Sequence, residues 1–483
     1  MLASRKGENE MESKGKNRLI RGIICIAAAV IIWNIPMPEG VRPEAWHLFA
    51  IFAGTILSFI LQPMSLGASA IFACTASAML GVMKPGEALS GFSNGTVWLI
   101  VSAFMFAIGF IKTGLGQRIA YIMLSKFGSS SLRVAYIMSI ADFIIAPFTP
   151  SNTARGGGII YPIISSICST LKIDPSNEKY RRTGQFLIYS SYVAVITSAC
   201  IFLTGASNNA LAASLASELF GVTLGWTDWF IACIVPGLIL EIISPIILYK
   251  IINPELKKTP ETMKHAKNEL SHMGAMTIKE KVIGVIFICC LLLWATGSIT
   301  HFDNTFIALS GLVAMIITGC IKWDDVLEEK GAWDVLVWMG VLVNMAAYLS
   351  KFGLMSWFAG TMSDMLAGMS WVVMMIVAAA VYVYIHYFFA SNSAHVAALF
   401  AAFGTVLIAA GAPPLGVLIM LGTLANACSF LTHYGCGVTP IFFGAGFMEQ
   451  GQWWKIGFLL STLHIIVWLG IGMPWMYVCG FFG

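Results

Sequence analysis

Charged residues are scarce in this sequence. Asp, Glu, Lys and Arg make up 11% of its 483 residues, whereas soluble domains carry about 25%, so a soluble protein is excluded. Apolar runs of roughly the 20 residues needed to cross a bilayer recur from Leu19 to the C-terminus. The alternating pattern of a transmembrane barrel is also missing. The sequence therefore predicts an all-α polytopic membrane protein.

Motifs for catalysis and for energy coupling are missing as well. There is no Walker A sequence to bind ATP, and no HExxH or paired aspartates inside the membrane to support a protease. The eleven cysteines are scattered, with only Cys289 and Cys290 adjacent, and no Cys/His spacing suits a metal. We therefore expect no enzyme, no metal site, no cofactor and no nucleic-acid partner.

Eleven apolar runs are predicted to cross the membrane as helices. Two further segments, 132–170 and 369–410, carry a polar tip between apolar arms that are each too short to cross alone. This pattern is typical of re-entrant helical hairpins. The predicted spans are 19–35, 44–62, 65–83, 95–123, 183–215, 227–252, 279–299, 303–321, 332–364, 413–445 and 454–481.

Lys and Arg are distributed unevenly between the two sides of the membrane. Six lie before the first span or in its first turn and seven lie in the polar stretch 250–281, while only Arg42 and Lys84 fall clearly on the other side. The positive-inside rule then makes residues 1–18 a cytoplasmic tail of a multi-pass protein in the plasma (inner) membrane. It also places the first hairpin on the cytoplasmic side and the second on the opposite side.

The chain contains two related halves. The pentad Ser151-Asn152-Thr153-Ala154-Arg155 recurs half a chain later as Ser391-Asn392-Ser393-Ala394-His395. Lys112-Thr113-Gly114-Leu115 likewise matches Lys351-Phe352-Gly353-Leu354, in the same order. An odd number of predicted crossings separates the pentads, so the halves are expected to be inverted repeats, as in many secondary transporters. The predicted division is a first half, 19–252, a cytoplasmic linker, 253–278, and a second half, 279–483.

Each pentad is expected to begin a helix inside the membrane. Such a helix start leaves N–H groups unpaired and carries partial positive charge, and Ser, Thr and Asn are favourable caps for it. If the two tips enter from opposite faces, they converge on a site for an anion with two separated carboxylates. The alternative is that they only cap buried half-helices. The expected binding residues are Ser151, Asn152, Thr153, Ser391, Asn392 and Ser393.

Arg155 and His395 occupy the same place in the two pentads. A charge at membrane depth costs roughly 2.5–3.5 kcal/mol, so such residues usually face a cavity or a partner. We expect both to help hold a polyanion or to replace a co-transported cation. The alternatives are that Asp142 is a structural partner of Arg155 and that His395 is neutral with its hydrogen bonds satisfied.

Two of the predicted spans are interrupted by polar, Gly- or Pro-containing stretches. Thr204 to Asn209 interrupts one of them and Thr432 to Pro440 the other. Gly and Pro end or kink helices, and the neighbouring polar groups could reach a ligand or could simply be structural. Substrate contacts are predicted at Thr204, Thr432, Thr439 and Pro440.

The paired motifs resemble those of the divalent anion/sodium symporter (DASS) family. The variants ending in Arg155 and His395 are similar to its citrate/succinate, tartrate/succinate and 2-oxoglutarate/malate translocator branch. The resemblance implies a homodimer that moves its substrate by an elevator motion, with the substrate held at the two hairpin tips. It also implies basic residues in place of sodium in the exchanger branch. Ser393 stands where the family motif has Thr, a change that keeps the hydroxyl.

The function expected from the sequence is exchange of di- or tricarboxylates, with small carboxylate anions and membrane lipid as partners. The alternative is a Na⁺-coupled dicarboxylate symporter. An anion channel is less favoured, because interrupted inverted repeats are typical of carriers. The sequence leaves open which carboxylate is carried.

Overall fold

The computed structural model describes the backbone of residues 2–176, 178–366 and 368–482, and the side chains from residue 17 onward within these ranges, apart from residues 297, 298 and 366. All regular elements in these ranges are helical. Ten helical stretches are long and apolar enough to cross a membrane. The predicted class, an all-α polytopic membrane protein, is confirmed.

The ten stretches differ from the eleven predicted spans because the ends of the helices do not coincide with the ends of the apolar runs. α3 (Leu66–Met79) and α15 (Asn304–Ile317) have only 14 residues each. Three hairpin arms, in contrast, reach 18 residues: Ser131–Phe148, Trp371–Phe388 and Asn392–Ala409. The prediction that each arm is too short to cross was therefore wrong for these three. At a rise of about 1.5 Å per residue they extend about 27 Å.

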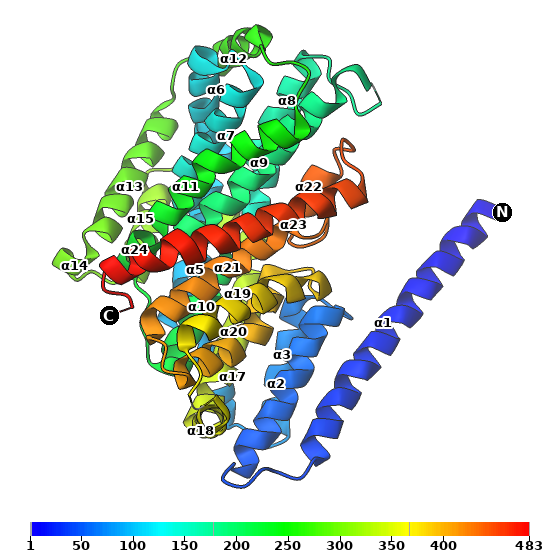
Figure 1. Cartoon of the computed structure of the whole chain (residues 1–483), viewed down its shortest axis with the longest axis vertical. Helices are drawn as coiled ribbons and strands as arrows, with labels where there is room; N and C mark the ends of the chain where they lie inside the picture. The colour runs from blue at the N-terminus through cyan, green and yellow to red at the C-terminus, as the bar shows by residue number, and fades with distance from the viewer. Residues whose placement is uncertain (1, 177, 367, 483) are drawn as a thin grey trace.

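The N-terminal helices lie together at one end of the molecule (Figure 1). α1 (Leu2–Asn34) packs along α2 (Pro43–Leu61), and α2 packs on α3. α17 (Lys330–Lys351), from the second half, packs against both α3 and α5 (Gly95–Thr113). The helix of the first predicted span thus begins at Leu2, and the two halves of the chain interlock.

The matched Lys-x-Gly-Leu sequences end a helix in each half. α5 ends at Gly114, whose φ is +74°, and α6 (Leu115–Phe127) follows directly. α17 ends in the same way before Gly353, whose φ is +89°, and α18 (Leu354–Leu366) follows. Glycine adopts this left-handed conformation without a Cβ penalty, so it ends helices readily. The predicted continuous spans 95–123 and 332–364 are therefore each two helices.

Each predicted hairpin is a pair of helices joined at a polar pentad. In the first, α7 (Ser131–Ile145) ends in a 3₁₀ turn, and after the tip a π-helical segment (Thr153–Ile160) leads into α8 (Tyr161–Thr170). In the second, α19 (Trp371–Tyr384) also ends in a 3₁₀ turn, and α20 (Asn392–Ala409) follows the tip. The segments 132–170 and 369–410 thus have the helix–tip–helix form that the sequence predicts.

The predicted helix breaks are confirmed. α9 (Arg181–Ile201) stops before a short 3₁₀ turn, and α10 (Ser207–Phe220) starts after it. α21 (Pro414–Ala427) stops likewise, and irregular chain leads to α22 (Thr439–Phe443). All side chains in the most apolar window of α9 are buried. Each half therefore places a broken helix after its hairpin.

The remaining helices enclose this central part. α12 (Pro260–Met273), inside the predicted linker, packs on α6 and α8 at the end of the molecule away from α2 and α3 (Figure 1). The long helix α11 (Trp226–Ile252) packs on α9 and α7. The others are α13 (Ile278–Ala295), α23 (Gln450–Val467), α24 (Met473–Val478) and the short helices α4 (Pro85–Leu89), α14 (Gly297–Thr300) and α16 (Trp323–Glu328).

Candidate functional site

The two pentads meet at one cavity of about 160 Å³. Pockets for drug-sized ligands are typically about 300–1,000 Å³, so this cavity suits only a small molecule. The breaks in both halves contribute to its wall. The lining residues are Pro150, Ser151, Asn152, Thr153, Ala206, Ser207, Asn208, Ser391, Asn392, Ser393, Cys436 and Gly437.

The first tip is held in shape by its own helix start. The Ser151 Oγ accepts the backbone N–H of Ala154 at 3.1 Å, and the Ser151 carbonyl accepts that of Arg155 at 2.9 Å. The wide π-helical turn that follows contains Gly156, where a Cβ would come within 2.6 Å of the Val438 side chain. A glycine is needed there because the tip packs so closely against the other half.

The second tip repeats this capping. The Ser391 Oγ accepts the N–H of Ala394 at 3.4 Å, and the Ser391 carbonyl accepts that of His395 at 3.0 Å. The Asn392 Nδ2 donates to the Ser429 Oγ at 2.8 Å, which fixes the amide at the edge of the cavity. The capping role that the sequence indicates for both serines is therefore present.

Three helix starts lie in the cavity wall. They belong to the segment that begins at Thr153, to α10 at Ser207 and to α20 at Asn392. All other donors in the wall are hydroxyl, amide or thiol groups, and none of the lining residues is charged. Partial positive charge from helix starts, without a fixed cation in the wall, favours a small anion.

Arg155 does not line the cavity. It is fully buried behind the first tip, where its Nε donates to both carboxylate oxygens of Asp142 at 2.9 and 3.0 Å. Its Nη2 donates to the Asn152 Oδ1 at 3.2 Å. The alternative interpretation, in which Asp142 is its structural partner, therefore describes the geometry. Arg155 reaches the cavity only through Asn152.

The same guanidinium also satisfies three backbone carbonyls. Nη1 donates to the oxygens of Thr149 at 2.8 Å and Gly205 at 2.9 Å, and Nη2 donates to that of Val195 at 2.8 Å. These carbonyls come from the first tip, the break after α9 and α9 itself. A cationic side chain thus fills a cluster of carbonyl oxygens between three elements.

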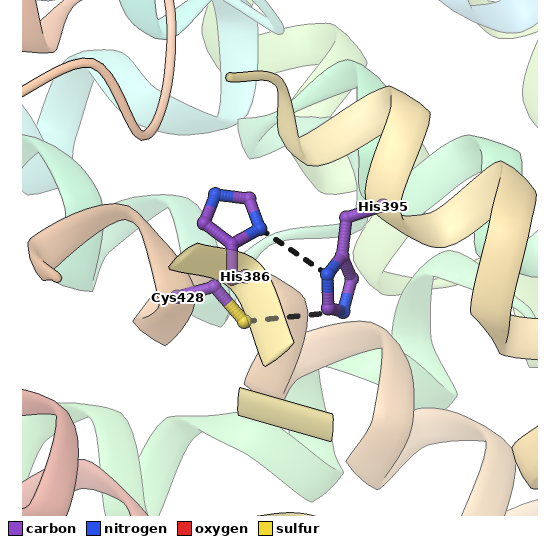
Figure 2. A group of neighbouring side chains, drawn as sticks. All are labelled: His386, His395 and Cys428. Carbon is purple, nitrogen blue, oxygen red and sulfur yellow. Dashed lines mark hydrogen bonds between the residues drawn. The ribbon is translucent and has the colours of Figure 1, made fainter. Parts of the chain in front are cut away.

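His395 is also fully buried behind its tip, facing His386 and Cys428 (Figure 2). The His386 Nε2 lies 2.8 Å from the Gly435 carbonyl, which can only accept, so this nitrogen carries the hydrogen. The Nδ1 of a neutral His386 is then an acceptor, and His395 donates to it from its own Nδ1 at 3.2 Å. The other His395 nitrogen, Nε2, lies 4.0 Å from the Cys428 Sγ. Both rings are thus satisfied as neutral imidazoles, which agrees with the alternative interpretation of His395.

His386, His395 and Cys428 are also the one group of three possible metal ligands found among the described side chains, with donor atoms within 4.8 Å of one another. Imidazole and thiolate are donors that suit transition metals. The hydrogen bonds above account for both rings without an ion, so the group is complete as it stands. The sequence gives no signal for it because the three residues do not follow a ligand spacing.

Four predicted contacts lie outside the cavity wall. Thr204 donates to the Pro147 carbonyl at 2.6 Å, and Thr439 is hydrogen-bonded to Tyr192 at 3.0 Å. The Thr432 Oγ1 is buried and has no hydrogen-bond partner among the described residues. Pro440 is exposed and is the second residue of the short α22. In this conformation these residues shape the breaks and do not face the cavity.

The sequence analysis missed six residues of the wall. Pro150 directly precedes the first pentad. The other five belong to the two breaks that the sequence does identify: Ala206, Ser207 and Asn208 at the start of α10, and Cys436 and Gly437 before α22. The orientation of each of these residues depends on where the helix resumes, which the sequence of a break does not specify.

Comparison with known proteins shows which family this chain is similar to. The family described as "Sodium:sulfate symporter transmembrane region" matches residues 16–482. YflS of Bacillus subtilis (strain 168), whose name describes it as a candidate malate transporter, is 45% identical over 473 residues, which cover 98% of this chain and 99% of that protein. The chloroplastic dicarboxylate transporter 1 of Spinacia oleracea is 41% identical over 457 residues, covering 94% of this chain and 80% of that protein.

Two solved transporter structures are similar in fold. MtrF of Neisseria gonorrhoeae has a TM-score of 0.58 at 14% identity and covers 96% of this chain and 95% of its own. YdaH of Alcanivorax borkumensis has a TM-score of 0.54 at 12% identity and covers 97% and 99%. At such low identity the likeness concerns the arrangement of the helices alone.

Proposed function

Because the chain belongs to the sodium:sulfate symporter family, the DASS family that its paired pentads resemble, we propose that it is a secondary transporter that exchanges di- or tricarboxylates across the membrane. Two relatives of nearly full length carry names that describe transport of malate or of dicarboxylates. Membership of this family confirms the resemblance seen in the sequence. Because the family consists of transporters, the protein is not an enzyme.

The observation that carries the proposal is the cavity between the two tips. Its small volume, its neutral polar wall and the three helix starts around it favour a compact anion. Hydroxyl and amide groups from Ser151 and Asn152 on one side and from Ser391 and Asn392 on the other could each receive one carboxylate. A substrate with carboxylates at its two ends would thus bridge the repeats.

The surroundings of Arg155 support exchange without sodium. Backbone carbonyls at broken helices commonly coordinate Na⁺ in transporters. Here three such oxygens, from Thr149, Val195 and Gly205, are bonded by the guanidinium of Arg155. The guanidinium of Arg155 thus occupies the position that a transported Na⁺ would take among these oxygens.

The wider assignments rest on the family resemblance and on the charge distribution. We assign the protein to the plasma membrane with its N-terminus in the cytoplasm. We further assign it a homodimeric state and an elevator motion that carries the cavity between the two faces. The predicted halves, 19–252 and 279–483, with the linker 253–278 between them, would then be the two inverted repeats.

Counterflow in proteoliposomes tests the function. Vesicles loaded with unlabelled succinate should accumulate labelled succinate in sodium-free buffer, and malate, 2-oxoglutarate, tartrate and citrate should compete to the extent that they fit the cavity. Ser151→Ala and Asn392→Ala should lower uptake. Ser271→Ala, on the exposed face of α12, is the matched control and should not.

Other outcomes separate the alternatives. Uptake that appears only when Na⁺ is added would establish sodium-coupled symport, which the family description favours. Currents far above carrier rates would indicate an anion channel. Folded protein that shows no carboxylate counterflow under any of these conditions would overturn the proposal.

A further inference from the structure

A buried carboxyl group without a cation of its own lies behind the first tip. Glu241, in α11, is 7% exposed and sits inside a 27-residue apolar helix that is long enough to cross the membrane. Its Oε1 accepts a hydrogen bond from the Ser198 Oγ of α9 at 2.8 Å. No Lys, Arg or His among the described residues forms an ion pair with it.

The charges around Glu241 do not balance if both nearby acids are ionised. The charged or titratable groups that interact with it are Asp142 from α7, Arg155 from the first tip and Cys200 from α9. Arg155 is bonded to both oxygens of Asp142. One guanidinium therefore lies near two carboxyl groups, and it is already hydrogen-bonded to Asp142.

An unpaired carboxylate at this depth is strongly unfavourable. One bound proton removes the excess negative charge. We expect it on Glu241, because Asp142 is already paired with the Arg155 guanidinium. A protonated Glu241 still accepts from Ser198. The group is thus set up to bind and release one proton, while the Asp142–Arg155 pair stays intact.

Glu241 is connected to the cavity through hydrogen bonds and charge. Asn152 lines the cavity and accepts from the Arg155 Nη2, and Arg155 interacts electrostatically with Glu241. An anion in the cavity adds negative charge beside Arg155, which makes ionisation of Glu241 less favourable. By linkage, protonation of Glu241 must favour binding of the anion to the same degree.

We propose that Glu241 is a proton-binding site coupled to the carboxylate site, so that the carrier binds its anion together with one proton. The step is simple protonation of a carboxylate, and no other bond changes. This inference rests on the proposed transport of carboxylates and adds a second bound species to it. It also predicts that a pH gradient biases the exchange.

Glu241→Gln is the matched variant, because Gln keeps the shape and the hydrogen bond of the protonated acid but cannot ionise. Wild-type counterflow should fall by roughly tenfold as the pH rises from mildly acidic to alkaline, a coupling within the usual range for two linked sites. Glu241→Gln should lose this alkaline fall and stay active. Glu218→Gln, at a half-buried acid on α10, is the control and should keep the wild-type profile.

A direct measurement supports the same test without any variant. Purified wild-type protein in weak buffer with a pH indicator should take up protons when succinate is added at alkaline pH, and Glu241→Gln should not. No uptake by the wild type, or the same alkaline fall in wild type and Glu241→Gln, would overturn the proton site while leaving transport established. Wild-type protein without counterflow at any pH would instead overturn the proposed function.

Discussion

Asn209 and Asn426 join the two halves of the chain: the Nδ2 of Asn426 donates to the Oδ1 of Asn209 at 2.7 Å. Asn208, which lines the cavity, donates to Asn426 as well, at 3.2 Å. Asn209 also caps the end of α9 by donating to the carbonyls of Ala199 and Phe202. Three buried amides thus hold the break of the first half against α21 of the second.

Removal of one of these amides should weaken the protein. In Asn426→Ala, Asn208 and Asn209 stay bonded to each other, but each loses its buried hydrogen bond to Asn426, which should cost about 1–2 kcal/mol of unfolding free energy. Thermal unfolding in detergent should show the loss as a lower midpoint. Asn34→Ala removes only a local bond at an exposed helix end and should leave the midpoint unchanged. Equal midpoints for the two variants would contradict the bridging role.

Gly437 marks the closest approach between the second break and the first tip. A Cβ there would lie 2.6 Å from the Thr153 Oγ1, inside the cavity wall. Gly437→Ala should therefore displace Thr153 and lower counterflow by roughly tenfold or more, since small displacements in a binding site have large effects. Gly360→Ala is the control, because nothing lies within 4 Å of its Cβ. Unchanged uptake by Gly437→Ala would show that the substrate does not use this wall.

Arg155 should be needed for both folding and exchange. Arg155→Ala leaves Asp142 as an unpaired buried carboxylate, at a cost of about 3–5 kcal/mol, so the single variant should fold poorly and exchange nothing. The double variant Asp142→Asn/Arg155→Gln removes the orphaned charge and should recover the unfolding midpoint but not sodium-free counterflow. Wild-type counterflow by the double variant would show that the guanidinium serves folding alone.

The sequence could predict the architecture because the repeat and the apolar runs each left a clear pattern. The matched pentads and the two breaks appear at the predicted places, whereas the helix ends near Gly114 and Gly353 divide runs that were predicted as continuous spans. Two of the hairpin arms were underestimated because the 3₁₀ turns that extend α7 and α19 consist of ordinary aromatic and apolar residues. The third arm, α20, reaches 18 residues without such a turn.

The roles of individual site residues were harder to predict. Asp142 was identifiable as a partner of Arg155, because one acid lies near in the sequence. The carbonyls of Val195 and Gly205 carry no sequence signal, since every residue has one, and only packing brings them to the guanidinium. His386 beside His395 is likewise a product of the turn at the end of α19.

Thr432 is predicted from the sequence to contact the substrate, but in this structure it lies outside the cavity wall. Its hydroxyl is buried without a partner among the residues described, so Thr432→Val replaces it by a methyl group at no cost in hydrogen bonds. Folding and counterflow should both stay within about twofold of the wild type. Loss of counterflow with normal folding would show that the Thr432 hydroxyl reaches the substrate during transport.

Glu255, in the predicted linker, should make the free energy of unfolding depend on pH. Its carboxylate accepts from the N–H and the hydroxyl of Thr183, both at 2.8 Å, and from the Arg182 Nε at 3.0 Å. Partial burial raises its pKa, but these hydrogen bonds outweigh that effect and hold the pKa below its ordinary value of 4.5. The stabilisation is therefore complete above pH 4.5 and is lost as the pH falls through the folded-state pKa.

Glu255→Gln tests this directly. The variant should unfold at a lower temperature than the wild type near neutral pH, and the difference should shrink on acidification. Glu261→Gln, on the neighbouring α12, serves as the comparison. A difference that stays constant down to the lowest pH would contradict the assigned role of the carboxylate.

The burial of α9 from Thr183 to Ile201 has a mechanical consequence. Val195 of α9 accepts from Arg155, which in turn holds Asn152. About one turn earlier in the same helix, Tyr192 donates to the Ser429 carbonyl at 2.6 Å, and the Ser429 hydroxyl is bonded to Asn392. One helix thus anchors the two asparagines on opposite walls of the cavity. Any rearrangement that turns the cavity toward the other face of the membrane must move α9 and both tips as a rigid unit, with the gap between the two asparagines preserved.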